Sequence, residues 1–393
     1  MVKRVTKKKI LLLSDDLRMS SGVGTMSREF VYGTLHKYDW VQIGGAIKHP
    51  EEGKTVDISK EAGEVVGVKD AYLKVFPISG YGNPDLLRQI MDAEKPDAIM
   101  HYTDPRFWGW LYQMEHEIRQ QIPIFYYNIW DDLPYPRWNE NFYESCDLIM
   151  NISKQTVNIV DNVCQNKPRT DLDSTYIPHG INEKYFYPLN ESELNDKKFI
   201  RYKEAMLRKQ EKDFILFYNA RNIKRKMVGD IILAYNKFCS LLPKEKADKC
   251  LLLMHTSPVD QHGTHLPNLI KELCTHGDVA FSDQKISPEA LNMLYNIADV
   301  TILISSNEGF GLSGAESLMC GTPIILNVTG GMQDQCGFKI NDKHITYKDY
   351  SEIGSLHDHR LWENNESLTH GEWVKPVWPK TRSLMGSVPT PYI

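Results

Sequence analysis

Residues 305–325 read SSNEGFGLSGAESLMCGTPII, and this stretch predicts a strand end, a glycine loop, a short helix and a second strand. We expect the helix to begin near Leu312, directly after the glycines. Gly321 fits a helix C-cap, and Pro323 cannot continue a helix, so the next strand should start there. A strand, a glycine loop and a helix in this order are typical of a ligand-binding turn in an α/β fold.

The glycine loop carries the residues that favour ligand binding. Gly309 and Gly311 let the backbone approach a ligand closely, and the helix that follows offers free N–H groups to a phosphate. Glu308 lies in the loop and Glu316 lies inside the helix. We therefore expect the two carboxylates to reach different parts of one ligand, although two glutamates at this spacing alone would indicate nothing.

Short apolar runs recur through the chain, with helical stretches between them. Because these runs are continuous rather than alternating, they predict strands that are buried on both faces, as in parallel sheets of βα units. The result is an α/β fold of two doubly wound, Rossmann-like domains that face each other across a cleft, with ligands at the carboxyl ends of the strands. The runs are Ile10–Leu13, Ala98–Met100, Ile124–Ile129, Leu148–Ile152, Tyr176–Ile177, Phe214–Tyr218, Leu251–Met254, Val279–Phe281, Val300–Ile304 and Ile324–Leu326.

A charged stretch between the fifth and sixth runs indicates the domain boundary. We predict an N-terminal domain at 1–190, a charged linker at 191–212 that buries little, and a C-terminal domain at 213–336. Residues 337–393 lose the pattern and are predicted to be irregular.

The composition sets limits on partners and compartment. The 393 residues hold 51 acidic and 46 basic side chains, a balance that gives no general attraction for nucleic acid or anionic membranes. The seven cysteines are scattered and never spaced as a metal-ligand pair, which favours free thiols in a reducing compartment. The apolar run Ile10–Leu13 is too short for a signal peptide or a membrane span. We therefore expect a cytoplasmic protein without a transmembrane segment.

The glutamate segment resembles the donor-binding motif of the retaining glycosyltransferases of the GT-B fold, in the large family 4 type known as glycosyl transferases group 1. The resemblance implies that Glu308 lies by the donor sugar and that Glu316 binds the ribose hydroxyls of the nucleotide. It also implies that the loop backbone contacts the sugar at Gly309, Phe310, Gly311 and Leu312.

A second match lies after the strand Phe214–Tyr218, where residues 219–226 read NARNIKRK. In this family an arginine and a lysine five residues later bind the diphosphate, which assigns that role to Arg221 and Lys226. Two fixed cations can stabilise the negative charge that grows on a leaving nucleoside diphosphate without a metal or another cofactor. Lys224 and Arg225 are interpreted as a solvated basic turn.

Further matches extend the resemblance from about residue 11 to residue 335. The resemblance implies that the domain at 1–190 is on the acceptor side and that the domain at 213–336 binds the nucleotide sugar. Gly22 and Gly24 belong to a glycine loop that would face the donor phosphates and the acceptor. His255, at a strand end, is placed where it could touch the donor, and Ile286 closes the loop that contacts the base in this family. The sequence predicts neither the base nor the sugar of the donor.

The acceptor side is the least informative part. Where many relatives carry a histidine, this chain has Trp130 and Asp131, so Trp130 could stack on a ring and Asp131 could orient a hydroxyl. Asp104 lies in the same aromatic-rich stretch, which is similar to glycosyltransferases common in large phage genomes. We expect a carbohydrate or glycolipid acceptor first and a hydroxymethylated DNA base second.

These matches predict a metal-independent, hexosyltransferase-like enzyme that retains the anomeric configuration. Two alternatives remain open: a sugar-nucleotide epimerase, which needs no separate acceptor, and a non-catalytic sugar-nucleotide-binding protein. A phosphorylase would need a cofactor lysine context that the sequence does not show. Relatives usually end in a helix that crosses back onto the N-terminal domain, and residues 336–393 show no such pattern, so we predict that this helix is lacking. The oligomeric state is open.

Overall fold

The computed structural model describes residues 7–46, 48–164, 172–352, 367–380, 385–387 and 390–392. The chain divides into two compact units. Unit 1 comprises Met1–His179 with Met385–Tyr392, and unit 2 comprises Gly180–Leu384.

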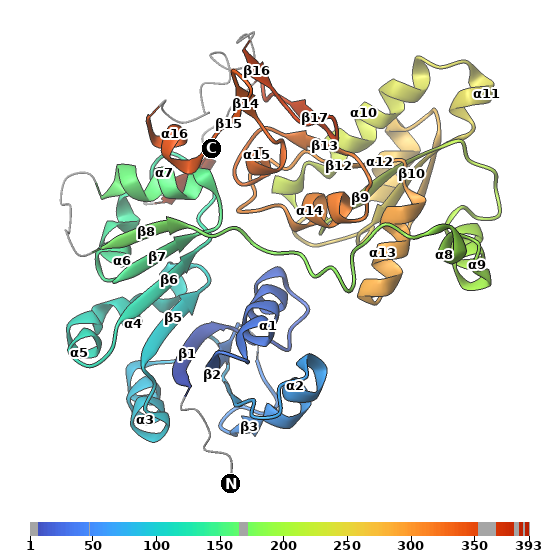
Figure 1. Cartoon of the computed structure of the whole chain (residues 1–393). Coiled ribbons are helices and arrows are strands. Elements are labelled where there is room, and N and C mark those ends of the chain that lie inside the picture. Colours follow the sequence, from blue (N-terminus) through green and yellow to red (C-terminus); the bar gives the residue numbers. More distant parts are fainter. Residues whose placement is uncertain are drawn as a thin grey trace. The chain divides into compact units, whose positions relative to one another are not determined.

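Unit 1 is built on an eight-stranded sheet in the order β3-β4-β2-β1-β5-β6-β7-β8, drawn in blue to green in Figure 1. All neighbouring strands are parallel except β3 and β4. The strands are β1 (Lys8–Asp15), β2 (Tyr38–Gly45), β3 (Val56–Asp57), β4 (Leu73–Pro77), β5 (Ala98–Tyr102), β6 (Ile124–Asn128), β7 (Leu148–Asn151) and β8 (Asp173–Tyr176). The helices are α1 (Gly22–Thr34), α2 (Ser59–Val66), α3 (Pro84–Glu94), α4 (Gly109–Gln113), α5 (Glu115–Arg119), α6 (Glu140–Glu144) and α7 (Lys154–Val163), with short 3-10 turns η1 (Pro105–Trp108) and η2 (Arg137–Asn139).

Strands β2 and β4 are absent from the set of predicted runs, and β2 shows why. It carries Gln42 in its centre, which interrupts the apolar pattern although the side chain is fully buried. The Gln42 amide donates to Ser14 Oγ at 2.7 Å and to the carbonyl of Asp15 at 2.9 Å, and its oxygen accepts the N–H of Leu17. A buried polar group that is fully hydrogen-bonded is tolerated in a core strand.

Unit 2 is built on a six-stranded parallel sheet in the order β11-β10-β9-β12-β13-β17. These strands are β9 (Phe214–Asn219), β10 (Cys250–His255), β11 (Asp278–Phe281), β12 (Val300–Leu303), β13 (Ile324–Asn327) and β17 (Val374–Val377). A small sheet joins β14 (Lys339–Ile340), β15 (Lys343–His344) and β16 (Leu368–Thr369). The helices are α8 (Glu191–Leu194), α9 (Lys197–Met206), α10 (Val228–Ser240), α11 (Lys244–Ala247), α12 (Leu266–Leu273), α13 (Pro288–Ile297), α14 (Leu312–Met319), α15 (Met332–Gln335) and α16 (Tyr347–Glu352), with the 3-10 turn η3 (Lys224–Lys226).

The alternating residues of β9 pack into two separate cores. Leu216 and Tyr218 belong to the cluster that α10 and α12 cover, and Ile215 and Phe217 belong to the cluster that α9 and α13 cover. The central strand of unit 2 is therefore buried on both faces. This confirms the predicted α/β class with doubly wound, mostly parallel sheets.

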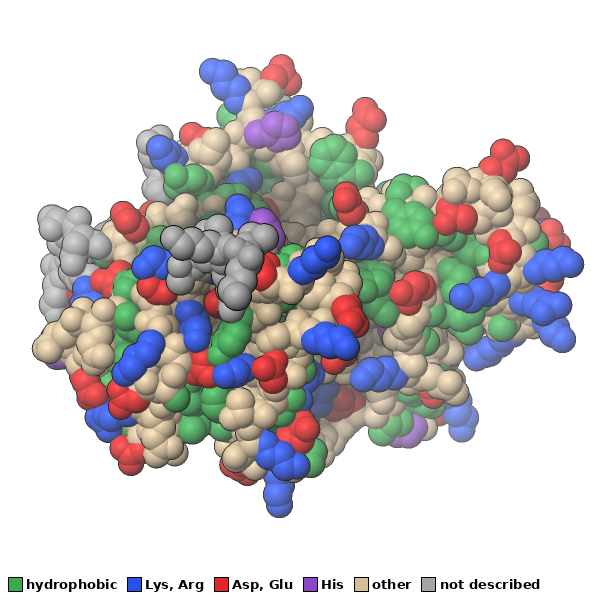
Figure 2. Space-filling model, turned by 60° about the horizontal axis from the view of Figure 1, so that its bottom comes forward, with side chains coloured by type: hydrophobic (Ala, Val, Ile, Leu, Met, Phe, Trp, Pro, Cys, Tyr) green, Lys and Arg blue, Asp and Glu red, His purple; other side chains and the backbone are tan. Residues whose placement is uncertain are grey.

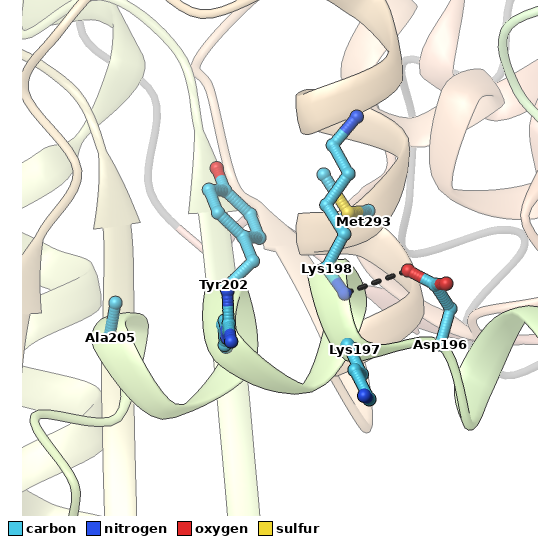
Figure 3. A pocket seen from close by; sticks show the side chains of 7 residues that line it. Asp196, Lys197, Lys198, Tyr202, Ala205 and Met293 are labelled. Atoms are coloured by element: carbon cyan, nitrogen blue, oxygen red, sulfur yellow. Dashed lines mark hydrogen bonds between the residues drawn. The ribbon is translucent and has the colours of Figure 1, made fainter.

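The segment 191–212, predicted to be a linker that buries little, instead packs on unit 2. It forms α8 and α9, and the side chains of Phe199 and Leu207 are buried in the core beside α13. Figure 3 shows Tyr202 of α9 next to Met293 of α13, in a surface pocket that both residues line. The apolar residues of α9 are spaced for one helix face, and the many lysines and arginines conceal this face in the sequence.

The C-terminal stretch 337–393 is more regular than the sequence indicates. Strand β17 adds to the edge of the unit 2 sheet, parallel to β13, and the N–H of Ile324 donates to the carbonyl of Trp373 at 2.9 Å. Within this stretch, residues 353–366 and 381–384 lie outside the described residues. The predicted lack of a crossover helix therefore stays a prediction. Strands β18 (Met385–Ser387) and β19 (Thr390–Tyr392) form a hairpin assigned to unit 1.

The composition predicts no transmembrane segment and free cysteine thiols. Within the part of the chain that the structure describes, no helix is long and apolar enough to cross a bilayer. All seven cysteines lie in that part, and each is a free thiol.

Candidate functional site

The candidate site lies at the carboxyl edge of the unit 2 sheet, where β9 and β12 end. The chain after β9 forms the turn η3, and the chain after β12 forms the glycine loop that leads into α14. The N–H of Ser306 donates to the carbonyl of Arg225 at 2.8 Å, and Arg225 Nη1 donates to the carbonyl of Asn307 at 2.8 Å. One backbone and one side-chain hydrogen bond thus join η3 to the glycine loop, and they fix the positions of the residues in both segments.

Glu308 is the centre of this junction. Its side chain is buried, Lys226 Nζ contacts Oε1, and Arg225 Nη1 lies 3.1 Å from Oε2. Burial alone would raise the pKa of the Glu308 carboxyl, but the charges of Lys226 and Arg225 outweigh this effect and lower the pKa below its ordinary value. Glu308 is therefore ionised at neutral pH, and each of its carboxylate oxygens contacts one cation.

The structure corrects the interpretation of Arg225 as part of a solvated turn. Its guanidinium faces Glu308, whereas Arg221, the predicted diphosphate ligand, faces a different loop. Arg221 Nε donates to Asp260 Oδ2 at 2.8 Å, and the Arg221 side chain is 59% exposed. Sequence comparison with the family motif could not find Arg225, because only its contact with Glu308 sets it apart from Lys224.

The glycine loop is supported by the segment that follows β13. The N–H of Gly331 donates to the carbonyl of Glu308 at 2.8 Å, and a Cβ on Gly331 would overlap the carbonyl oxygen of Gly309. Gln335 Nε2 donates to the carbonyls of Phe310 at 2.6 Å and Gly311 at 3.0 Å. The loop is thus held through its carbonyl groups. Gln335 is a supporting residue that no sequence motif indicated.

The helix after the loop has the predicted boundaries. It spans Leu312–Met319, and Gly311 precedes it with φ of 83°, a left-handed conformation that favours glycine. Gly321, with φ of 76°, follows the helix, and its N–H donates to the carbonyl of Leu318 at 3.0 Å. The predicted helix start and the glycine stop are confirmed.

Glu316 projects from this helix, and its carboxylate has one hydrogen-bond partner in the described part of the chain. Tyr295 of α13 donates its hydroxyl proton to Glu316 Oε2 at 2.7 Å. Burial raises the pKa of Glu316 to about 7, and the hydrogen bond from Tyr295 acts in the opposite direction. This carboxyl thus titrates near neutral pH, unlike Glu308.

The remaining predicted donor residues of unit 2 lie on neighbouring strands and loops. His255 ends β10, and its Nδ1 lies 2.8 Å from the carbonyl of Ser282, in the loop that follows β11. Burial lowers the pKa of His255, so its ring is neutral at pH 7. Ile286 packs against the core beside α13. These placements are consistent with a site at this edge, but they assign no role.

In unit 1, Gly22 and Gly24 form the first turn of α1. Ser21 caps the helix, accepting the N–H of Gly24 at 3.0 Å. A Cβ on Gly24 would lie 2.8 Å from the carbonyl oxygen of Met19 and 2.9 Å from that of Asp16. Glycine is thus required at position 24 for the turn itself, whatever the turn binds.

The predicted acceptor-side residues of unit 1 form one cluster with Arg106. The Arg106 guanidinium lies 5.0 Å from the centre of the Trp130 ring, and Arg106 Nη2 lies 2.5 Å from Asp104 Oδ2. Asp131 follows Trp130, and its backbone carbonyl accepts the side-chain amide of Gln155 at 2.9 Å. Trp130 and Asp104 are therefore brought together through Arg106, which the sequence analysis had not assigned to the site.

Residues 200–345 match the family model described as "Glycosyl transferases group 1". The matched region is similar to that family. It contains the junction of turn and loop, the glycine segment and both glutamates.

Solved structures extend the likeness to both units. The chain is similar to the HepE protein of Anabaena in complex with UDP and glucose, with a TM-score of 0.59, 14% identity and coverage of 88% of each chain. It is also similar to a sucrose-phosphate synthase from Thermosynechococcus elongatus, with a TM-score of 0.59, 16% identity and coverage of 91% and 90%. At these identities the likeness shows the fold, which is the predicted GT-B fold.

One curated relative is an N-acetyl-alpha-D-glucosaminyl L-malate synthase of Bacillus anthracis, which is 27% identical over 191 residues. The match covers 49% of this chain and 44% of the relative. The chain thus spans less than half the length of that relative.

Proposed function

We propose that the protein is a retaining glycosyltransferase that moves a sugar from a nucleotide-diphosphate sugar to an acceptor hydroxyl. The observation that carries the proposal is the convergence of Lys226 and Arg225 on Glu308 at the carboxyl edge of β9 and β12. Cations next to a buried carboxylate at this edge suit a ligand that has a diphosphate beside a hydroxylated ring.

The charges suggest how the donor is held. A bound diphosphate would compete with Glu308 for Lys226 and Arg225. The displaced carboxylate would then accept hydrogen bonds from hydroxyls of the sugar. The cations stabilise the charge that grows on the leaving diphosphate, which lowers the barrier for cleavage of the sugar bond. In the same-face route, a diphosphate oxygen takes the proton of the acceptor hydroxyl as the new bond forms, so the configuration is retained.

The nucleotide end of the donor would lie along α14. In the proposal the ribose hydroxyls donate to Glu316, and the loop from Gly309 to Leu312 lies against the sugar and the phosphates. The Anabaena relative has UDP and glucose bound, so UDP-glucose is the first donor to test.

The predicted metal independence is part of the proposal. It is supported by two fixed cations, because Lys226 and Arg225 can supply the positive charge that a divalent ion supplies elsewhere. Transfer that persists in excess EDTA would support it, and loss of transfer that Mg²⁺ or Mn²⁺ restores would reject it.

For the acceptor, a carbohydrate or glycolipid remains the first expectation and a modified DNA base the second. On the face in Figure 2, lysines and arginines are mixed with acidic side chains, whereas a DNA track needs cations along several phosphates. The Trp130–Arg106 stack suits a sugar ring or a base equally well. A phage-like origin and a cytoplasmic location stay expectations from the sequence.

The test is a transfer assay with radiolabelled nucleotide sugars and three acceptor classes: saccharides, lipids and hydroxymethylcytosine DNA. We expect labelled product with retained anomeric configuration, read by NMR of the new linkage. Isomerised nucleotide sugar without an acceptor would instead identify an epimerase. Donor binding without turnover on any acceptor would favour the non-catalytic alternative.

A further inference from the structure

A chain of three side chains lies behind the carboxylate of Glu316. Asn219, the last residue of β9, donates its amide N–H to Tyr295 Oη at 2.8 Å. The same oxygen donates its proton to Glu316 Oε2 at 2.7 Å. Because an amide nitrogen only donates, the tyrosine proton is directed to the carboxylate, so the order Asn219 to Tyr295 to Glu316 is fixed.

The middle residue of this chain is held rigidly. Tyr295 is fully buried, its ring meets Phe217 edge-on at 5.2 Å and Phe186 at 6.1 Å, and its carbonyl accepts the Thr322 hydroxyl at 2.7 Å. The hydroxyl therefore has one position, and the carboxylate oxygen that it contacts is fixed with it.

The backbone of Asn219 is held as well, by a residue of α14, the helix that follows the glycine loop. Ser313, in the first turn of α14, donates its hydroxyl proton to the carbonyl of Asn219 at 2.5 Å. The strand end, α13 and α14 are thus joined through Asn219, Tyr295 and Glu316, which belong to three different elements.

We propose that Tyr295 and Asn219 are positioning residues that hold Glu316 Oε2, so that Oε1 is left to accept the ribose hydroxyls of the donor. This inference rests on the proposed function. The inference assigns a role to two residues outside the glycine loop and outside η3. It also makes the preference for a ribonucleotide depend on one buried tyrosine hydroxyl.

The experiment compares a ribonucleotide with its 2′,3′-dideoxy analogue by titration calorimetry. The ribonucleotides UDP, GDP and ADP are screened first by thermal shift, and the strongest binder is used with its 2′,3′-dideoxy form. The variant is Tyr295→Phe. Its control is Tyr235→Phe, another buried tyrosine of unit 2, whose hydroxyl donates to the carbonyl of Asp278 at 3.0 Å in a different core.

We expect the wild type to prefer the ribonucleotide and Tyr295→Phe to reduce this preference about tenfold, the order expected for the loss of a hydrogen bond to a charged group. Tyr235→Phe should leave the ratio unchanged. The preference should also decrease as the pH falls, and in Tyr295→Phe the midpoint of this decrease should move to higher pH, since the tyrosine hydrogen bond lowers the pKa of Glu316.

Wild-type preference in Tyr295→Phe at every pH would overturn the inference, as would an equal loss in Tyr235→Phe. If Tyr295→Phe does not fold, Asn219→Ala must show the same change in ratio, and an unchanged ratio rejects the inference. If no nucleotide binds the wild type, the donor-site proposal itself fails. If a nucleotide binds but its dideoxy form binds equally well, only the ribose role of Glu316 fails.

Discussion

The guanidinium of Arg225 lies 3.1 Å from one carboxylate oxygen of Glu308, Oε2, and the ammonium group of Lys226 contacts the other, Oε1. One carboxylate thus pairs with two cations that come from the same turn, and a net positive charge remains. In the proposed function a bound diphosphate would take the place of Glu308, and both cations would then stabilise the charge that develops on the leaving group.

Replacement of Arg225 by alanine should lower kcat/KM about ten- to a hundredfold, because a charge-assisted contact at the donor phosphates is lost. Lys224→Ala, which changes an exposed neighbour in the same turn, is the control and should retain wild-type rates. Steady-state kinetics with the best donor checks both. Equal losses in the two variants would mean that the turn contributes only general positive charge.

Arg221 gives a prediction in the opposite direction. Its pairing with Asp260 competes with a bound diphosphate, so Asp260→Asn should tighten nucleoside diphosphate binding about two- to fivefold, the range for an exposed ion pair. The gain should shrink at high salt. Asp248→Asn, at another surface carboxylate of unit 2, should change nothing. Weaker binding in Asp260→Asn would show that the pair orients Arg221 instead of restraining it.

Gly331 tests the support of the glycine loop. A Cβ at this position would overlap the carbonyl of Gly309, so Gly331→Ala should displace the loop and reduce turnover more than about a hundredfold. Because Gly331 is buried and the overlap is with backbone, the melting temperature should fall as well. Gly33→Ala in α1, where a Cβ meets nothing within 4 Å, is the control and should be neutral or slightly stabilising. An active Gly331→Ala variant would contradict the arrangement.

The pKa of Glu316 leads to a prediction on stability. Burial raises the pKa from 4.5 to about 7, so the unfolded chain loses this proton at a lower pH than the folded protein. Below pH 4.5 both states hold the proton, and as the pH rises towards and above 7 the folded protein has to accommodate a disfavoured buried charge. Glu316→Gln should therefore stabilise the protein, by on the order of 2 kcal/mol more at pH 8 than at pH 5.

Urea unfolding of wild type and Glu316→Gln at the two pH values checks this. Glu272→Gln, at an exposed position of α12, is the control and should show no pH-dependent difference. A Glu316→Gln variant that is less stable at pH 8 than the wild type would show that the ionised carboxylate is favoured in the folded protein.

The glycine segment was predictable because its structure is decided locally. The helix start after Gly311 and the stop at Gly321 follow from the backbone conformations that only glycine adopts easily, so the pattern from 305 to 325 contained them. The buried runs of the parallel strands were predictable for a similar reason, since their burial on both faces makes them continuously apolar.

What the sequence could not predict depends on partners far along the chain. Arg221 and Arg225 are both arginines of the segment after β9, and the sequence does not show which of them faces the glycine loop. Their partners decide this, because Arg221 pairs with Asp260 and Arg225 pairs with Glu308. Likewise, the hydrogen bonds of Gln335 to two loop carbonyls exist only after α15 has packed beneath the loop.

In the proposed function, Lys226 and Glu308 of unit 2 hold opposite ends of one sugar diphosphate, Lys226 at the diphosphate and Glu308 at the sugar. Calorimetric binding of the best nucleoside diphosphate to Lys226→Ala and Glu308→Ala, measured beside sugar transfer, tests it most directly. We predict that Lys226→Ala loses binding and transfer together. Glu308→Ala should bind the nucleotide as well as or better than wild type, because a competing anion is gone, and yet fail to transfer the sugar. Undiminished binding in Lys226→Ala, or wild-type transfer in Glu308→Ala, would contradict the account.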